Sequence, residues 1–205
     1  MKNIFVGFWF CLVFTALSGC ENNSQEVSTR YLFLTDSIGT GAAAIQTIGY
    51  VKQIDLPEIY EVPTPCCGSG EALGRIEEIK TQIVENDIDT VWINVGMWDA
   101  VPGLTPRTPL DEYGQNIEMI FQELLDFGVD VIWCETTFTN WEFLNDYIFE
   151  ANIIADELAM EYGIPIFEMS YVQEIRGWPF MFDGFHFTDE TSGLIAMEVK
   201  EFLSN

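Results

Sequence analysis

Short apolar runs alternate with longer amphipathic segments along most of the chain. The apolar runs predict buried strands, because each is bounded by polar or turn-forming residues. We expect strands at residues 31–34, 59–62, 89–95, 129–133 and 164–167. The run at 89–95 is apolar from Val91 onward except for Asn94, so we expect it to be a central strand buried on both faces.

The segments between these runs have helical periodicity. In residues 71–85 the apolar side chains fall on one face of a helix, and residues 110–127 repeat the pattern. The expected core stripes are Leu73, Ile76, Ile79 and Ile83 in the first helix, and Ile117, Ile120, Phe121, Leu124 and Leu125 in the second.

Three further helices are expected. Residues 146–162 form a helix that Gly163 ends, and Thr188 caps a final helix that runs to about Leu203. The small residues 41–44 are expected to open a short helix close to the sheet. Residues 170–182 read as a loop.

The alternation of strands and helices predicts one domain over residues 30–205. Its architecture should be a parallel five-stranded sheet with helices on both faces, a three-layer α/β/α fold. Functional sites in such folds lie at the carboxyl ends of the strands. The residues that fall there are Ser37, Gly70, Trp98, Cys134 and the loop 183–186.

Residues 1–19 have the features of a targeting segment. Their apolar stretch, residues 4–16, is shorter than the ~20 residues of a membrane-spanning helix. Leu-Ser-Gly-Cys, ending at Cys20, resembles a bacterial lipobox. The resemblance implies cleavage before Cys20, acylation of its sulfur, and a lipid anchor on the extracytoplasmic side of a bacterial cell envelope. An ordinary secretory signal is the alternative. We expect residues 20–29 to be a flexible tether between the lipid and the domain.

The composition excludes several partners. The formal net charge is -25, from 33 acidic and 8 basic residues. Nucleic-acid binding needs a basic face, and none is visible. Docking of the folded body on an anionic membrane is disfavoured for the same reason, so we expect membrane contact through the N-terminal lipid only. No cofactor or metal site is expected, since one histidine and a few thiols offer too few ligands.

The sequence Asp183-Gly184-Phe185-His186 is a candidate for acid–base chemistry. His186 is the only histidine, and its type is the one that titrates near neutral pH without perturbation. Asp183 lies three residues earlier, so a loop could bring the carboxylate to one ring nitrogen and leave the other for chemistry.

Ser37 is the candidate nucleophile. It follows the first strand, at the position that a site in such a fold requires. Ser69 lies in a glycine-rich turn, but Cys67 and Glu71 occupy the places that glycines hold in a nucleophile elbow. The same turn does not have the spacing of a dinucleotide-binding motif.

Four motifs together resemble those of the SGNH, or GDSL, hydrolases. They are Thr35-Asp36-Ser37-Ile38, Gly70-Glu71-Ala72, Gly96-Met97-Trp98-Asp99 and Asp183-Gly184-Phe185-His186. The resemblance implies a flavodoxin-like α/β fold and a Ser37–His186–Asp183 triad that hydrolyses esters. It also implies an oxyanion hole formed by the backbone N–H groups of Ser37 and Gly70, with a third donor from the motif at 96–99.

Two positions depart from the family pattern. Thr35 stands where the first motif usually has glycine, and Trp98 stands where the third usually has the oxyanion-binding asparagine. The indole N–H of Trp98 could donate in its place, or the hole has two donors. Asn94 lies too far along its strand to substitute, and we expect it to be a buried residue hydrogen-bonded within the core.

The remaining cysteines allow a disulfide. Cys134 at a strand end could pair with Cys66 or Cys67, since the extracytoplasmic side is oxidising. The aromatic residues near the final loop could line an acyl or sugar pocket, although packing of the loop is the simpler explanation for each of them: Trp178, Phe180, Phe182, Phe185 and Phe187.

The expected function is hydrolysis of small-molecule or glycan acyl esters, including deacetylation of a carbohydrate. Two alternatives stay open. The same acyl-enzyme could pass its acyl group to a sugar hydroxyl, or the chain could be a non-catalytic binding lipoprotein on a hydrolase fold. The sequence does not set the oligomeric state.

Overall fold

Five parallel strands form one sheet in the order β2-β1-β3-β4-β5. The computed structural model describes residues 28–42, 46–62, 68–102, 107–177 and 183–205. The strands are β1 (Tyr31–Thr35), β2 (Ile59–Glu61), β3 (Thr90–Asn94), β4 (Asp130–Cys134) and β5 (Ile166–Phe167). β3 is central and buried at every position, as its apolar sequence predicts.

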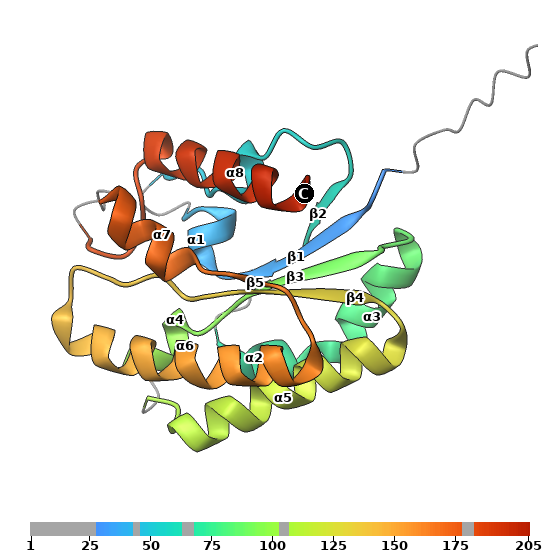
Figure 1. Ribbon diagram of the computed structural model, residues 1–205, viewed down its shortest axis with the longest axis horizontal. Coiled ribbons are helices and arrows are strands. Elements are labelled where there is room, and N and C mark those ends of the chain that lie inside the picture. The colour runs from blue at the N-terminus through green and yellow to red at the C-terminus, as the bar shows by residue number, and fades with distance from the viewer. Residues whose placement is uncertain (1–27, 43–45, 63–67, 103–106, 178–182) are drawn as a thin grey trace, which may run out of the picture.

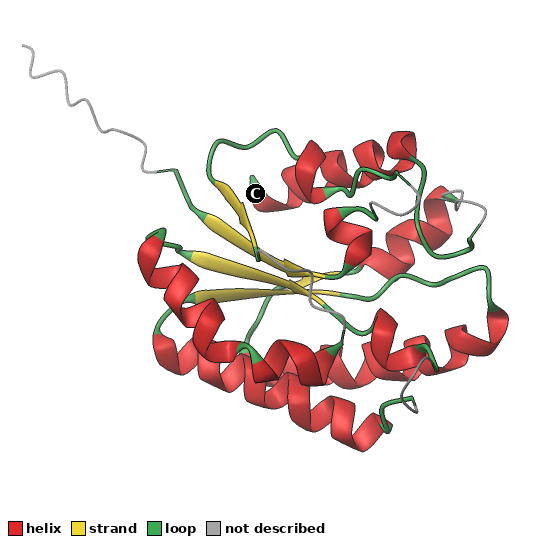
Figure 2. Cartoon of the chain, turned by 180° about the vertical axis from the view of Figure 1, so that it is seen from behind, coloured by secondary structure: helices red, strands yellow, loops and turns green. Residues whose placement is uncertain are grey.

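Helices cover both faces of the sheet, which confirms the predicted three-layer architecture (Figures 1 and 2). One face carries α2 (Ser69–Gly74), α3 (Ile76–Glu85), α4 (Met97–Ala100), α5 (Leu110–Phe127) and α6 (Glu142–Tyr162). The other carries α1 (Ser37–Thr40), the 3-10 helix η2 (Val51–Gln53), α7 (Met169–Arg176) and α8 (Asp189–Leu203).

Each layer of helices has its own core, and β3 supplies side chains to both. Val91 and Ile93 point into the core beneath α5 and α6. Trp92, which lies between them, points into the core beneath α8. This alternation follows from the strand repeat of two residues, and it explains why Val91, Trp92 and Ile93 in the middle of the strand are all apolar.

Three helical predictions were wrong in their limits. The segment 71–85 is two helices, because the chain turns at Arg75 after the weakly helix-forming Gly74. The helix predicted at 146 begins four residues earlier, at Glu142. Residues 169–176 form α7 instead of a loop, and Gly177 ends it in the left-handed region at φ 61°.

The short helix expected after the first strand lies elsewhere than predicted. It spans Ser37–Thr40, directly after β1, and ends at Gly41 with φ 88°. The final helix agrees with its prediction: the Thr188 hydroxyl accepts the Thr191 N–H, and α8 ends at Leu203. None of the helices in the described ranges combines the length and apolar character that a bilayer crossing requires.

Candidate active site

Ser37, His186 and Asp183 form a continuous hydrogen-bonded chain. His186 Nε2 lies 2.8 Å from Ser37 Oγ, and His186 Nδ1 lies 2.7 Å from Asp183 Oδ2. The carboxylate favours the tautomer that keeps the proton on Nδ1, which leaves Nε2 as the acceptor for the serine proton. The structure therefore brings together the three residues that the sequence predicted for a triad, and their catalytic roles stay a prediction.

Ser37 is the first residue of α1, immediately after β1. The preceding Asp36 caps this helix, with Oδ1 accepting the Ile38 N–H at 2.8 Å. The cap turns the chain sharply at the strand end and presents the serine hydroxyl at the edge of the sheet. As the first residue of a helix, Ser37 also has a backbone N–H without an intrahelical acceptor.

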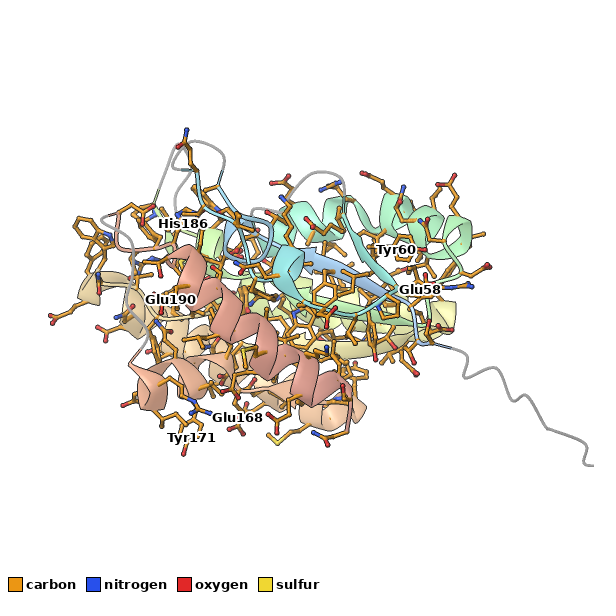
Figure 3. All side chains as sticks on the ribbon, turned by 90° about the horizontal axis from the view of Figure 1, so that it is seen from above. Glu58, Tyr60, Glu168, Tyr171, His186 and Glu190 are labelled. Atoms are coloured by element: carbon orange, nitrogen blue, oxygen red, sulfur yellow. The ribbon has the colours of Figure 1, made fainter. Side chains whose placement is uncertain are left out.

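Asp183 and His186 share a tight loop before α8. Asp183 Oδ1 accepts the Phe185 and His186 backbone N–H groups at 3.0 and 3.1 Å, so Oδ2 faces the imidazole. Gly184 permits this turn because its φ is +76°. Figure 3 shows His186 at one end of the molecule, with Glu58 and Tyr60 of the β2 region toward the other.

The two carboxyl groups beside the reacting atoms have opposite electrostatic character. Partial burial raises the pKa of Asp183, but hydrogen bonds from Phe185 N–H and from His186 outweigh it and hold the pKa below its ordinary value. Full burial raises the pKa of Asp36 to about 7; the Ile38 N–H opposes this rise, and the charge of Asp99 adds to it. Asp183 is therefore suited to stabilising an imidazolium.

An apolar pocket of about 100 Å³ opens beside Ser37 and His186. Its walls are Ile38, Met97, Trp98, Val101 and Phe185. Phe185 was one of the aromatic residues considered for a pocket, and it does line one. Phe187 instead lies in the core beneath α8, and Trp178, Phe180 and Phe182 lie outside the described residues.

The helix that carries Gly70 is fixed by a buried carboxylate that the sequence did not single out. Asp99 Oδ2 accepts the Ser69 N–H at 2.8 Å, and Asp99 Oδ1 accepts the Ser69 hydroxyl at 2.7 Å. Asn116 Nδ2 donates to the same hydroxyl at 3.1 Å. Ser69 is thus a structural residue, and Gly70, the second residue of α2, keeps a backbone N–H without an intrahelical acceptor.

Trp98 lies in the pocket wall, one residue before Asp99. Trp98 is 47% exposed to solvent, and it lines the same pocket as Ser37 and His186. Trp98 therefore borders the reaction space, and its role as an oxyanion donor stays a prediction.

The departure at Thr35 has a local counterpart. Thr35 is buried at the end of β1, and a Cβ on Gly39 would lie 2.1 Å from the Thr35 hydroxyl oxygen. Glycine at 39 thus makes room for threonine at 35, so the departure does not disturb Ser37.

Asn94 is buried as expected, and its Nδ2 donates to the backbone carbonyls of Cys134 and Glu135 at 3.3 and 2.9 Å.

Trp141 supports the triad loop from outside, and sequence reasoning missed it. Its indole Nε1 donates to the Asp183 carbonyl at 2.9 Å, and the neighbouring Asn140 N–H donates to the Gly184 carbonyl at 2.9 Å. The only available signal was the position of Trp141 after a strand end, which it shares with many loop residues.

The predicted disulfide stays a prediction. Cys134 is buried, whereas Cys66 and Cys67 lie outside the described residues, as does Cys20. In the ranges that are described, no three His, Cys, Asp or Glu side chains cluster in a way that could hold a metal ion.

Comparison with known proteins shows the fold. No protein-family model matches the chain, and no curated protein matches its sequence. Solved structures do match. A lipase/acylhydrolase from Enterococcus faecalis has a TM-score of 0.68 at 16% identity, over 85% of this chain and 95% of that one.

Two esterases give similar agreement. The psychrotrophic esterase EstA from Pseudoalteromonas sp., solved with monoethylphosphonate as inhibitor, has a TM-score of 0.66 at 16% identity, over 87% and 100% of the two chains. The acetylxylan esterase Axe2 from Geobacillus stearothermophilus has a TM-score of 0.65 at 16% identity, over 84% and 93%. The chain therefore has the fold of these enzymes.

Proposed function

We propose that the chain is a serine ester hydrolase. The observation that carries the proposal is the hydrogen-bonded chain from Ser37 Oγ through His186 to Asp183, beside an apolar pocket. The shared fold with a lipase/acylhydrolase and with esterases supports it. The four motifs that resemble those of SGNH hydrolases lie at the start of α1, the start of α2, the start of α4 and the loop before α8.

The reaction follows from this geometry. Ser37 Oγ attacks the ester carbonyl carbon while His186 Nε2 takes the hydroxyl proton, and the carbonyl oxygen becomes an oxyanion. The tetrahedral intermediate collapses to an acyl-serine, and His186 returns the proton to the leaving alkoxide. Water then attacks the acyl-serine while His186 Nε2 takes its proton, and a second tetrahedral intermediate forms. His186 returns that proton to Ser37 Oγ as the bond from Ser37 to the acyl carbon breaks, which releases the acid and the free serine.

Backbone donors at two helix starts are suited to holding the oxyanion. Ser37 and Gly70 lie at the first and second positions of α1 and α2, where N–H groups have no intrahelical acceptors. The Trp98 indole is the candidate third donor. Each such donor is typically worth ~10²–10³ in rate.

The pocket favours a short acyl group. An apolar cavity of roughly 150 Å³ holds a benzene molecule. The cavity beside Ser37 is smaller, at about 100 Å³, and its walls are apolar. Acetyl and similarly small acyl groups fit this size, and a structural neighbour is an acetylxylan esterase. The proposed substrates are therefore short acyl esters, with acetylated glycans among them.

A serine-reactive phosphonate tests the proposal. Wild-type protein should be labelled at one site and should hydrolyse vinyl acetate, and Ser37→Ala should abolish labelling and lower kcat by ~10⁴-fold or more. Circular dichroism of the variant controls for folding. Wild-type protein that is neither labelled nor active would instead support a non-catalytic binding protein, and an acylated sugar product would indicate transfer.

We also propose that the domain is held at the extracytoplasmic face of a bacterial envelope through an acylated Cys20. The resemblance of Leu-Ser-Gly-Cys to a lipobox is the support. Incorporation of radioactive palmitate in a bacterial host should be lost in Cys20→Ser; incorporation that persists in the variant contradicts the anchor.

A further inference from the structure

A row of aromatic side chains leads outward from the pocket. Phe185 forms a pocket wall, and its ring centroid lies 6.4 Å from that of Trp141. Trp141 in turn lies 6.2 Å from Phe143. The outer two side chains are 46% and 60% exposed, so the row of Phe185, Trp141 and Phe143 connects the reaction space with the solvent.

Hydrogen bonds hold the outer two residues of the row in place through the indole N–H of Trp141 and the backbone of Phe143. Neither bond uses a ring face, so the exposed ring surface is open to a ligand. The Trp141 indole N–H is occupied by the Asp183 carbonyl at 2.9 Å. The Phe143 carbonyl accepts Arg107 Nη2 at 3.3 Å, and Arg107 Nε donates to the Ala100 carbonyl at 2.9 Å. Arg107 thus links the end of α4 to the start of α6. Since Trp98 is in α4 and Phe143 is in α6, this link fixes the pocket wall at Trp98 relative to the aromatic row.

Such an arrangement suits the alcohol part of an ester more than its acyl part. The acyl group is accommodated by the small pocket beside Ser37, whereas the row lies outside that pocket. Trp141 and Phe143 are large, apolar and about half exposed, so much of their surface gains no free energy from burial within the protein. A ligand that covers this surface removes it from water and gains that free energy on binding.

A sugar ring fits these surfaces better than a hydrocarbon chain does. The ring planes of Trp141 and Phe143 are inclined at 68°, so they form an open, stepped surface and do not enclose a chain. A pyranose needs only one covered side: its C–H groups meet the negative π face, and its hydroxyls stay in water. The strong negative charge of the protein also disfavours anionic ligands.

We propose that the row of Phe185, Trp141 and Phe143 is a subsite for the carbohydrate ring that carries the acyl ester. The proposal rests on the proposed ester hydrolysis and extends it to the substrate class. In this placement, the sugar ring stacks on one of the two outer rings, Trp141 or Phe143, and contacts the other at its edge. Its acyl group enters the pocket beside Ser37.

The test compares two acetate esters that differ in their alcohol, acetylated xylobiose and vinyl acetate. The quantity to measure is the ratio of kcat/KM for the sugar ester to that for vinyl acetate. Phe143→Ala should lower this ratio about tenfold, mainly through KM, because it removes one stacking surface. Phe149→Ala is the matched control: Phe149 lies on the same helix and is 56% exposed, but it is not part of the row.

Three results would overturn the subsite. The ratio could be the same in Phe143→Ala and wild type, Phe149→Ala could lower it equally, or Phe143→Ala could instead weaken hydrolysis of vinyl hexanoate, which would assign the row to an acyl chain. Failure of the proposed function is recognised separately, since the wild type would then hydrolyse neither acetate. Calorimetric titration of Ser37→Ala protein with acetylated xylobiose keeps the subsite testable, because adding Phe143→Ala should weaken binding without any turnover.

Discussion

Trp98 is the residue at which this site departs most from the family that it resembles. Its side chain borders the pocket, so it is both a wall and a candidate donor. Trp98→Phe keeps an aromatic wall and removes the indole N–H. We expect kcat for vinyl acetate to fall by ~10²-fold with little change in KM, the loss typical of one oxyanion donor. A variant with wild-type kcat would show that two backbone donors suffice.

Asp99 acts on the site through another residue. It accepts both the N–H and the hydroxyl of Ser69, and Gly70 is the next residue. Burial raises the pKa of Asp99 above its ordinary value, and hydrogen bonds from Ser69 and Thr108 only partly oppose this rise. This carboxylate therefore sets the position of the Gly70 N–H.

Asp99→Asn tests this positioning role. The amide oxygen replaces only one of the two acceptors, so the start of α2 should shift and kcat should fall by about 10-fold or more, with KM less affected. Ser69→Ala keeps the backbone hydrogen bond to Asp99 and should cost less. Equal losses in the two variants, or a loss confined to KM, would contradict the positioning role.

At the scale of elements, the start of α6 holds the triad loop. Trp141 and Asn140 donate to consecutive carbonyls of that loop, those of Asp183 and Gly184. A Cβ on Gly184 would lie 2.7 Å from Trp141 Nε1, so the two segments are in close contact. The orientation of His186 therefore depends on α6 as well as on its own loop.

Trp141→Phe removes one of the two hydrogen bonds that hold the triad loop and keeps an aromatic ring. We expect kcat for vinyl acetate to fall about 10-fold, because Asp183 becomes less well placed on the imidazole. The pH at which kcat/KM is half-maximal should also change, since Asp183 stabilises the protonated imidazole. An unchanged pH profile combined with a lower melting temperature would indicate a structural role alone.

Most of the fold could be predicted from the sequence, because each strand is a compact apolar run. The position of Ser37 after β1 and the pairing of Asp183 with His186 depend on local sequence and were predicted with it. The contacts of Trp141 and Asp99 could not be predicted. They join residues 42 and 30 positions apart, and no short pattern encodes such distances. The start of α6 was also missed, because its N-cap, Trp141, makes no side-chain capping hydrogen bond and so gives no helix-start signal in the sequence.

At the scale of the whole molecule, one buried and one half-buried carboxyl group set the dependence of stability on pH. Burial raises the pKa of Asp36 to about 7 from an ordinary 3.8. Burial, with the charge of Glu135, raises the pKa of Asp156 to about 7 as well. Between about pH 4 and 7 the folded state binds more protons than the unfolded state, so the free energy of unfolding falls as pH rises through this window.

The melting temperature should therefore be higher at pH 5 than at pH 8, by on the order of 5 °C. Repulsion within a chain of net charge -25 acts in the same direction. Asp36→Asn keeps an acceptor for the Ile38 N–H and removes one titrating group, so it should reduce the difference between the two pH values. A melting temperature that rises from pH 5 to pH 8 would contradict this assignment.

The 149 positions between Ser37 and His186 also have a consequence during synthesis. The candidate nucleophile leaves the ribosome early, at the start of α1, whereas His186 and the loop that orients it come after β5. A partial chain that ends before residue 186 contains no histidine to act as general base, since His186 is the only one in the sequence. Under the proposed function, a nascent chain therefore cannot form an acyl-serine with the help of His186 until residue 186 has been synthesised, so activity should begin only in the completed domain.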